Sequence, residues 1–220
     1  MNAQTLKGVL NSISRLMTEN RDYLVELDQQ NGDGDLGISM AAGFKAVSDY
    51  LASAGEKDLG KLFMKSSGIF NEAAPSSLGT ILSIGFMGMA KSLKGKEEAG
   101  IEEITAAMEA GIAAIMEKAK SKPGEKTILD ALCPAVEVIK NAGGSAEAVI
   151  WTKAAEAAAK GSESTRGMKP VHGRAVYYGE KSIGMLDGGS VAGKLIFEGI
   201  KTYRDTVNIQ FIPNLSCKDP

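Results

Sequence analysis

The sequence is organised around residues 27–39, which read Leu-Asp-Gln-Gln-Asn-Gly-Asp-Gly-Asp-Leu-Gly-Ile-Ser. Asp33 and Asp35 stand on either side of a glycine, so their side chains can turn to one point, and Asp28 can reach that point from the end of a helical pattern. Such a convergence of like charges is unfavourable unless a cation lies between them. Because the ligands are all oxygens and no His or Cys is near, the pattern predicts a hard cation, Mg²⁺ or Ca²⁺.

The same residues also suit an ordinary solvated turn, because Asp and Gly both favour turns, and the stretch alone leaves both interpretations open. A calcium-binding EF-hand is excluded. Its best register starts at Asn31, but Leu36 then stands where glycine is needed and Ala42 where glutamate is needed. A hydrated Mg²⁺ held by few carboxylates and by substrate phosphates fits better. The start of the following helix would offer free N–H groups to those phosphates.

Composition narrows the class of protein. The chain has 220 residues, of which 44% are hydrophobic and 24% charged, a balance typical of a globular protein with a large core. The net charge of −2 comes without a Lys/Arg cluster, so no nucleic-acid partner is expected. There is no apolar run long enough to span a bilayer, no signal peptide, and too few cysteines for a disulfide framework. We therefore expect a cytoplasmic protein with no membrane partner.

Apolar residues recur at helical spacing in eight segments, and no series of strands is present. The first segment runs from Thr5 to Asp28 and ends at the acidic loop. The pattern predicts an all-α fold, an eight-helix antiparallel up-down bundle or barrel. Residues 207–211 alternate as a short extended piece would. We expect one domain over residues 1–220, with a core of about 5–205 and an extended C-terminal tail.

The odd-numbered connections between the predicted helices differ in composition from the even-numbered ones. In an up-down bundle, alternate connections fall on the same end. The first, third, fifth and seventh are the acidic loop, residues 74–77, residues 123–127 and a long segment at 165–185. These four contain Asp, Ser, Lys or Arg together with Gly or Pro, whereas the others are plain polar turns. Parity therefore places three Asp, helix N-termini, a Lys and an Arg around one mouth, as a Mg²⁺–nucleotide phosphate site requires.

Helix capping alone also explains each of these connections taken separately. Neither a Walker A sequence nor a kinase-type Gly-rich loop is present, so those two phosphate-binding devices are excluded. The single histidine, His172, lies in the long segment, and we interpret it as exposed or structural rather than as a catalytic base.

Three stretches carry a family resemblance. The acidic loop continues into Met-Ala-Ala-Gly-Phe at 40–44, residues 124–132 read Gly-Glu-Lys-Thr-Ile-Leu-Asp-Ala-Leu, and residues 173–184 contain Gly-Arg-Ala, Tyr-Gly and Ser-Ile-Gly before Asp187. In this order they resemble the ADP-binding L subunit, or L domain, of dihydroxyacetone kinases. The resemblance runs from about residue 5 to residue 205.

The resemblance implies an eight-helix antiparallel barrel with ADP or ATP at one end. It also implies two Mg²⁺ ions held by Asp28, Asp33 and Asp35, and a role for Arg174 in stabilising phosphate charge. The nucleotide-binding positions that it implies are Leu36, Gly37, Ile38, Ser39, Ala73, Ala74, Ser76, Ser77, Ile128, Arg174, Asp187, Gly188 and Gly189.

An L subunit passes a phosphoryl group from the Mg²⁺-bound nucleotide to a hydroxyketone that a separate K subunit binds through a histidine. His172 does not match that residue, so the resemblance makes this chain half of an enzyme. A phosphotransferase-system phosphodonor protein and a homodimer remain open as further partners.

Three departures mark a divergent member. The family's Asp-His-Gly is Asp-Leu-Gly at 35–37, its Gly-Gly-Ala-Ser-Gly-Pro-Leu phosphate loop is Asn-Glu-Ala-Ala-Pro-Ser-Ser at 71–77, and its Asp-Pro-Gly-Ala is Asp-Gly-Gly-Ser at 187–190. Two alternative functions follow: a non-catalytic, nucleotide-sensing regulatory partner, and a kinase subunit for another triose or tetrose ketone. An all-α scaffold whose acidic loop is only a turn is a third hypothesis.

Overall fold

The computed structural model describes residues 1–210, which contain nine α-helices, two 3₁₀-helices and no β-strand. The prediction of an all-α protein is confirmed. In chain order the elements are α1 (Ala3–Glu19), α2 (Arg21–Gln29), α3 (Leu36–Ser53), α4 (Leu59–Ala73), α5 (Ser77–Ser92), α6 (Ile101–Ala119), α7 (Leu129–Lys140), α8 (Glu147–Ser164), η1 (Thr165–Gly167), η2 (Arg174–Ser182) and α9 (Gly188–Gln210). None of these helices has the length and apolar content that crossing a membrane requires.

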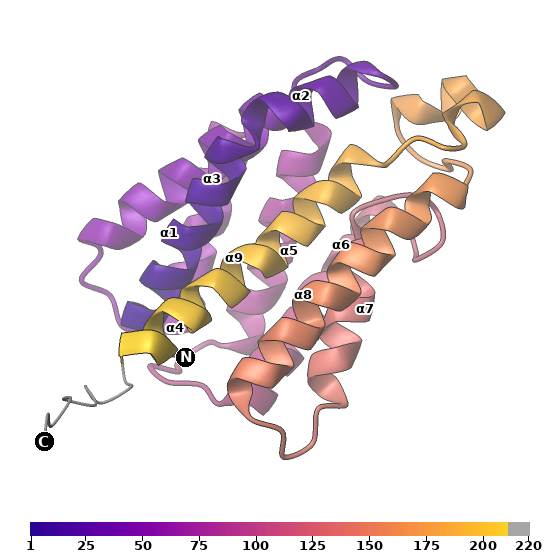
Figure 1. Ribbon diagram of the computed structural model, residues 1–220. Coiled ribbons are helices and arrows are strands. Elements are labelled where there is room, and N and C mark those ends of the chain that lie inside the picture. The colour runs from indigo at the N-terminus through magenta and orange to yellow at the C-terminus, as the bar shows by residue number, and fades with distance from the viewer. Residues whose placement is uncertain (211–220) are drawn as a thin grey trace, which may run out of the picture.

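The helices are arranged as a ring. From α3 onward each α-helix packs against the next one along the chain, and α9 packs against α1, which in turn contacts α3 (Figure 1). The acidic loop, the segment before α9 and the first turn of α9 gather at one end, at the upper right of Figure 1, and the N-terminus lies at the other.

Three local predictions were wrong. The segment predicted as one helix from Thr5 to Asp28 is divided at Asn20, whose side chain and backbone N–H both bond to the Leu16 carbonyl and so end α1. The long segment is not a plain loop, because η1 and η2 lie within it. Residues 207–210, predicted as extended, continue α9, and Phe211 lies outside the described residues.

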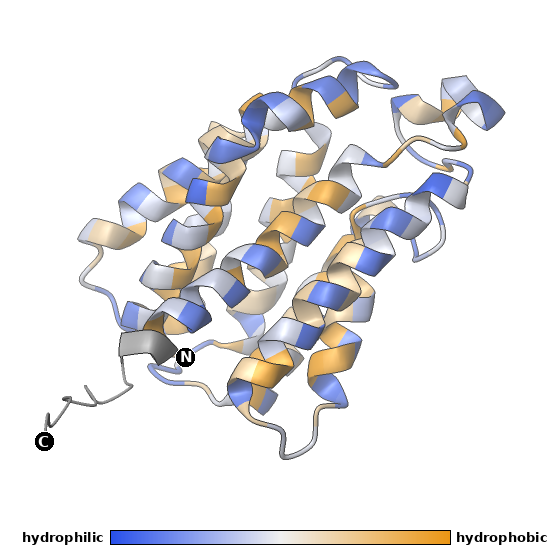
Figure 2. Ribbon diagram, in the orientation of Figure 1, coloured by the Kyte–Doolittle hydropathy of each residue, from blue (hydrophilic) through white to orange (hydrophobic). Residues whose placement is uncertain are grey.

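Apolar faces of the helices form one buried cluster, and each helix carries both apolar and polar residues in Figure 2. At its centre Phe44 meets Phe70 edge to face, with ring centroids 4.9 Å apart. Small residues bring α5 and α6 together, since a Cβ added at Gly88 would lie 2.6 Å from the Ala110 carbonyl oxygen. Between the helices an apolar cavity of about 120 Å³ remains.

Candidate functional site

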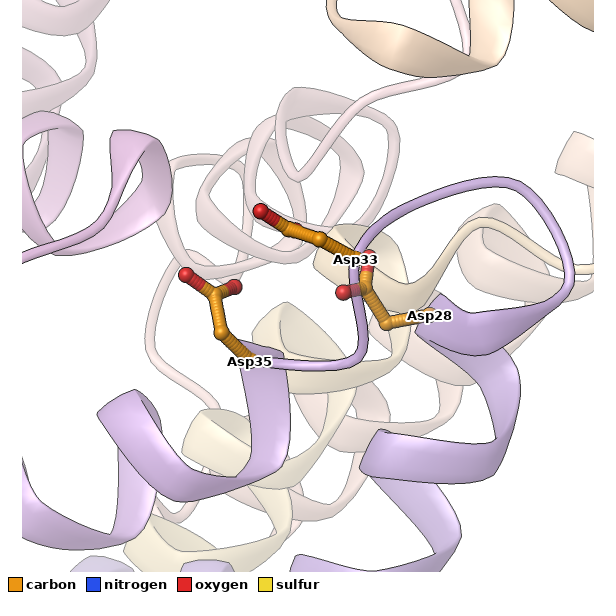
Figure 3. A group of neighbouring side chains, drawn as sticks. All are labelled: Asp28, Asp33 and Asp35. Atoms are coloured by element: carbon orange, nitrogen blue, oxygen red, sulfur yellow. The ribbon is translucent and has the colours of Figure 1, made fainter.

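The three aspartates predicted to hold a metal lie together. Asp28 is at the end of α2, Asp33 is in the loop and Asp35 is the residue before α3, and one oxygen from each lies within 4.8 Å of the others. Figure 3 shows the three side chains turned toward the same space. No other such group of three His, Cys, Asp or Glu residues occurs in residues 1–210.

The backbone of the acidic loop explains this convergence. The Gly34 N–H donates to Asp28 Oδ2 at 2.7 Å, which folds the loop back onto the end of α2. Gly34 has φ +78°, a conformation that favours glycine, and a Cβ added at Gly32 would clash with the Asp28 carboxylate. The two glycines are thus needed for the aspartates to meet.

The electrostatics of the loop suit a cation. Burial, followed by the charges of Asp33 and Asp28, raises the pKa of the Asp35 carboxyl, and nearby Arg174 partly opposes this rise. Arg174 Nη2 lies 2.8 Å from Asp33 Oδ2. A divalent cation would stabilise the charged form of all three carboxylates. Three carboxylates within reach of one ion are a donor set that fits Mg²⁺.

The prediction that the four unusual connections lie together at one end is confirmed. Residues from all four unusual connections line one cleft of about 690 Å³ beside the three aspartates. Of the predicted nucleotide-binding positions, the cleft wall includes Leu36, Ser76, Ser77, Ile128, Arg174, Asp187, Gly188 and Gly189.

The other five predicted positions do not line the cleft. Gly37 faces α2, where an added Cβ would clash with the Arg21 carbonyl oxygen, and Ala74 is fully buried. Ile38 is 58% exposed outside the cleft. Ser39 is buried with its hydroxyl 3.0 Å from that of Ser76. Ala73 ends α4.

The first residues of α3, α5, α7 and α9 all line the cleft. Ser76 caps α5 by accepting from the Gly79 N–H, and Ser77 follows at the cleft wall. Asp35 makes no side-chain cap to α3, so the first N–H groups of that helix lack an intrahelical partner beside the three carboxylates. Together these ends supply N–H donors of the kind that bind phosphate.

Asp187 also lines the cleft, and it caps α9 by accepting from the Ser190 N–H at 2.6 Å. Burial raises the pKa of its carboxyl to about 7, and the Ser190 hydrogen bond and the Lys126 charge oppose that rise. Asp187 therefore offers a polar group that is easily protonated, beside the apolar side chains of Ile128 and Leu36.

Lys126 does not present its charge to phosphates as the loop pattern suggested. It is 4% exposed, and its Nζ donates to the carbonyl oxygens of Ser182 and Met185, each at 2.8 Å. His172 lines the cleft, and its Nε2 lies 2.6 Å from Glu125 Oε2.

Four polar residues of the cleft wall were missed, Asn31, Thr80, Lys118 and Ser121. Asn31 Oδ1 and Ser121 Oγ are buried and have no hydrogen-bond partner within the described chain. Asn31 was present in the acidic loop as a polar, non-acidic residue. Lys118 and Ser121 lie just before residues 123–127, so extending that connection toward α6 would have found them.

Comparisons with known proteins point to one family. The family model described as the DAK2 domain matches residues 30–202. The ADP-binding subunit DhaL of PEP-dependent dihydroxyacetone kinase 2 from Listeria innocua is 32% identical over 195 residues, with 87% of this chain and 90% of that protein covered. The ADP-binding subunit DhaL from Escherichia coli is 28% identical over 173 residues, with 78% and 82% covered.

A solved structure shares the fold. It is the dihydroxyacetone kinase from C. freundii in complex with AMP-PNP and Mg²⁺, which matches with a TM-score of 0.73 at 22% identity. The match covers 92% of this chain but 34% of that one, so this chain spans about a third of the C. freundii protein.

Proposed function

Because this chain belongs to the DAK2 domain family, we propose that it is the nucleotide-binding subunit of a dihydroxyacetone kinase. It binds ADP or ATP with Mg²⁺ and passes a phosphoryl group to a hydroxyketone on a separate subunit. The observation that carries the proposal is the meeting of three carboxylates and helix N-termini in one cleft.

Asp28, Asp33 and Asp35 hold two Mg²⁺ ions in this proposal, and these ions would neutralise phosphate charge and align the phosphates. Ser76, Ser77 and the N-terminus of α5 bind the phosphates through hydroxyl and N–H donors. Catalysis then comes chiefly from positioning and electrostatics, as is usual for phosphoryl transfer.

Arg174 exchanges its partner when the nucleotide binds. With the metal site formed, the guanidinium leaves Asp33 and contacts the transferring phosphate, whose charge it stabilises. The part of the cleft wall formed by Leu36, Ile128 and residues 187–189 contacts the base and ribose. Within this wall the apolar residues exclude water and Asp187 provides the polar contact.

The acceptor subunit docks over the mouth of the cleft. Exposed large apolar residues occur in the segment between α8 and α9 that carries Arg174, and among them Tyr177 is 90% exposed. The others in this segment are Val171, Val176, Tyr178 and Ile183, and Ile38 is exposed in the first turn of α3. An exposed aromatic patch around a phosphate site is expected where a protein partner must bring the acceptor to it.

The test is reconstitution. The chain is mixed with a cognate dihydroxyacetone-binding subunit, Mg²⁺ and dihydroxyacetone, with ATP in one series and with phosphoenolpyruvate and phosphotransferase-system proteins in another. The proposal expects a triose phosphate in one of the two series, and an Asp33→Asn variant should make none. The names of the relatives favour the second series.

Two outcomes would redirect the assignment. Nucleotide binding without any sugar phosphate would favour the regulatory alternative, which the altered phosphate loop at 71–77 motivates. Turnover of another triose or tetrose ketone in preference to dihydroxyacetone would reassign the substrate.

A further inference from the structure

The segment between α8 and α9 has almost no buried side chains. From residue 166 to residue 185, which we call the rim segment, only Pro170 and Ser182 are buried. Hydrophobic burial therefore cannot fix its position, and polar contacts must do so. The rim segment carries Arg174, whose guanidinium reaches across the mouth of the cleft to Asp33.

Both ends of the rim segment are tied to one side chain. Lys126 Nζ donates to the carbonyl oxygens of Ser182 and Met185 at 2.8 Å, and to that of Met168 at 3.4 Å. Met168 precedes η2 and the other two acceptors lie at its end or beyond it. A buried ammonium group needs such partners, because leaving it unpaired is costly. The Lys126 ammonium thus joins the two ends of the segment, together with two bonds between Arg166 and Gly184, each 2.8 Å long.

The neighbouring residue makes a second attachment. The Glu125 carbonyl accepts from the Val171 N–H at 3.4 Å, and its carboxylate lies 2.6 Å from His172 Nε2. These two contacts hold the stretch immediately before Arg174. Glu125 and Lys126 together therefore fix the rim segment on either side of the arginine.

The turn that presents these two residues is itself rigid. Asp130 accepts from the backbone N–H groups of Gly124 and Thr127, and Glu125 accepts from that of Lys122. Lys126 has φ +61°, which costs a non-glycine residue about 1 kcal/mol or more. Its side chain points into the rim segment from a backbone that the surrounding hydrogen bonds hold in this unfavourable conformation.

We propose that Lys126 is a positioning residue for phosphoryl transfer, which acts by holding the rim segment so that Arg174 stands over the metal-binding aspartates. The inference rests on the proposed function for its catalytic consequence. It differs from a direct role in phosphate binding, because the Lys126 ammonium is already bonded to three carbonyls.

The first test needs no kinase activity. In Lys126→Met the rim segment loses its three bonds to the Lys126 ammonium, and only the bonds between Arg166 and Gly184 still join its ends. Trypsin should therefore cleave after Arg174 at least about tenfold faster than in the wild type. Lys126→Arg retains a donor group and should stay close to the wild-type rate. Lys122→Met, an exposed change in the same turn, is the matched control. Cleavage of Lys126→Met at the wild-type rate would overturn the proposal.

The second test separates positioning from general destabilisation. Lys126→Met should lower kcat for triose phosphate formation by about 10- to 100-fold, with little change in KM for the nucleotide. In an Arg174→Ala background the same change should have almost no further effect, because the residue through which Lys126 acts is gone. An equal loss in both backgrounds, or a loss confined to KM, would contradict the proposal.

Two cases need a further measurement: a Lys126→Met variant that does not fold, and a wild type that makes no triose phosphate. If Lys126→Met does not fold, Glu125→Ala removes the carboxylate contact with His172 and should also accelerate cleavage after Arg174. If the wild type makes no triose phosphate, the proposed function fails, while the cleavage rates still decide whether Lys126 holds the rim segment.

Discussion

Leu36 shows how a single residue adapts the site. It stands where the family resemblance leads one to expect histidine, and Gly188 stands where proline is expected. In the structure the two positions meet, since a Cβ added at Gly188 would lie 2.5 Å from Leu36 Cδ2. The Leu36 side chain thus occupies space that is free because Gly188 has no side chain. The two departures belong together, and the sequence alone did not connect them.

Asp35→Asn tests the charge balance of the acidic loop. Burial and the two neighbouring carboxylates raise the pKa of Asp35, so the charged form is unfavourable without a metal. In EDTA the variant should therefore gain free energy of unfolding, by no more than about 0.5 kcal/mol because solvent screens this exposed carboxylate. Its affinity for Mg²⁺–ADP should fall at least about tenfold. Substituting residues that only support metal ligands already weakens metal binding by that factor, and Asp35 is a proposed ligand. Denaturant unfolding and calorimetry measure the two effects.

The matched control is Asp49→Asn, an exposed carboxylate on α3 that pairs with Lys45. It should change neither quantity by more than a few tenths of a kcal/mol. If Asp35→Asn destabilised the metal-free protein, the repulsion assigned to the three carboxylates would be wrong.

Asp187 predicts a pH dependence with a definite sign. Burial raises its pKa from 3.8 to about 7, so between these values the folded protein holds a proton that the unfolded chain has lost. Stability from this group is therefore complete at low pH and falls as pH rises toward 7, by at most about 1.4 kcal/mol per pH unit. Asp187→Asn should remove this slope and be the more stable protein at pH 8.

The measurement is the difference in free energy of unfolding between wild type and Asp187→Asn, without Mg²⁺ or nucleotide, from pH 4 to 8. Taking the difference cancels the other carboxylates, such as Glu56, whose lowered pKa gives the opposite slope. A difference that does not change with pH would show that Asp187 keeps an ordinary pKa.

At the scale of elements, two glycines in neighbouring helices make a matched pair. Gly88 of α5 faces α6, where an added Cβ would lie 2.6 Å from the Ala110 carbonyl oxygen, whereas Gly68 of α4 faces open space. Gly88→Ala should therefore destabilise the protein by about 1–3 kcal/mol through overpacking. Gly68→Ala should stabilise it by about 0.4–1 kcal/mol through helix propensity.

Thermal or denaturant unfolding of the two variants measures this contrast. Equal effects of the two substitutions would mean that α5 and α6 do not approach as closely as their small residues allow.

The positions of the helices could be predicted where the spacing of apolar residues was interrupted by polar residues. Apolar spacing and polar breaks located most of the helices, and in the structure Ser76 and Asp187 cap α5 and α9. The break at Asn20 was missed because the apolar pattern continues across it from α1 to α2. The spacing of apolar residues shows which face of a helix is buried. Where one helix ends and the next begins with the same face buried, the spacing continues and the break cannot be seen in the sequence.

At the scale of the whole molecule, connection parity located the cleft correctly. Parity gives the end of the bundle at which a loop lies, but it does not give the direction of a side chain. Lys126 illustrates this limit, since it belongs to the right loop and yet bonds to the rim segment. Ala73 and Ala74 show the same for the phosphate loop, where the cleft begins only at Ser76.

The central claim is that the cleft binds a nucleotide through metal ions held by the three aspartates. Calorimetric titration of ADP into the wild type and Asp33→Ala, with and without Mg²⁺, tests it most directly. We expect the wild type to bind ADP only with Mg²⁺ and Asp33→Ala to bind at least about tenfold more weakly. Equal binding by both proteins, or ADP binding that does not depend on Mg²⁺, would contradict the account.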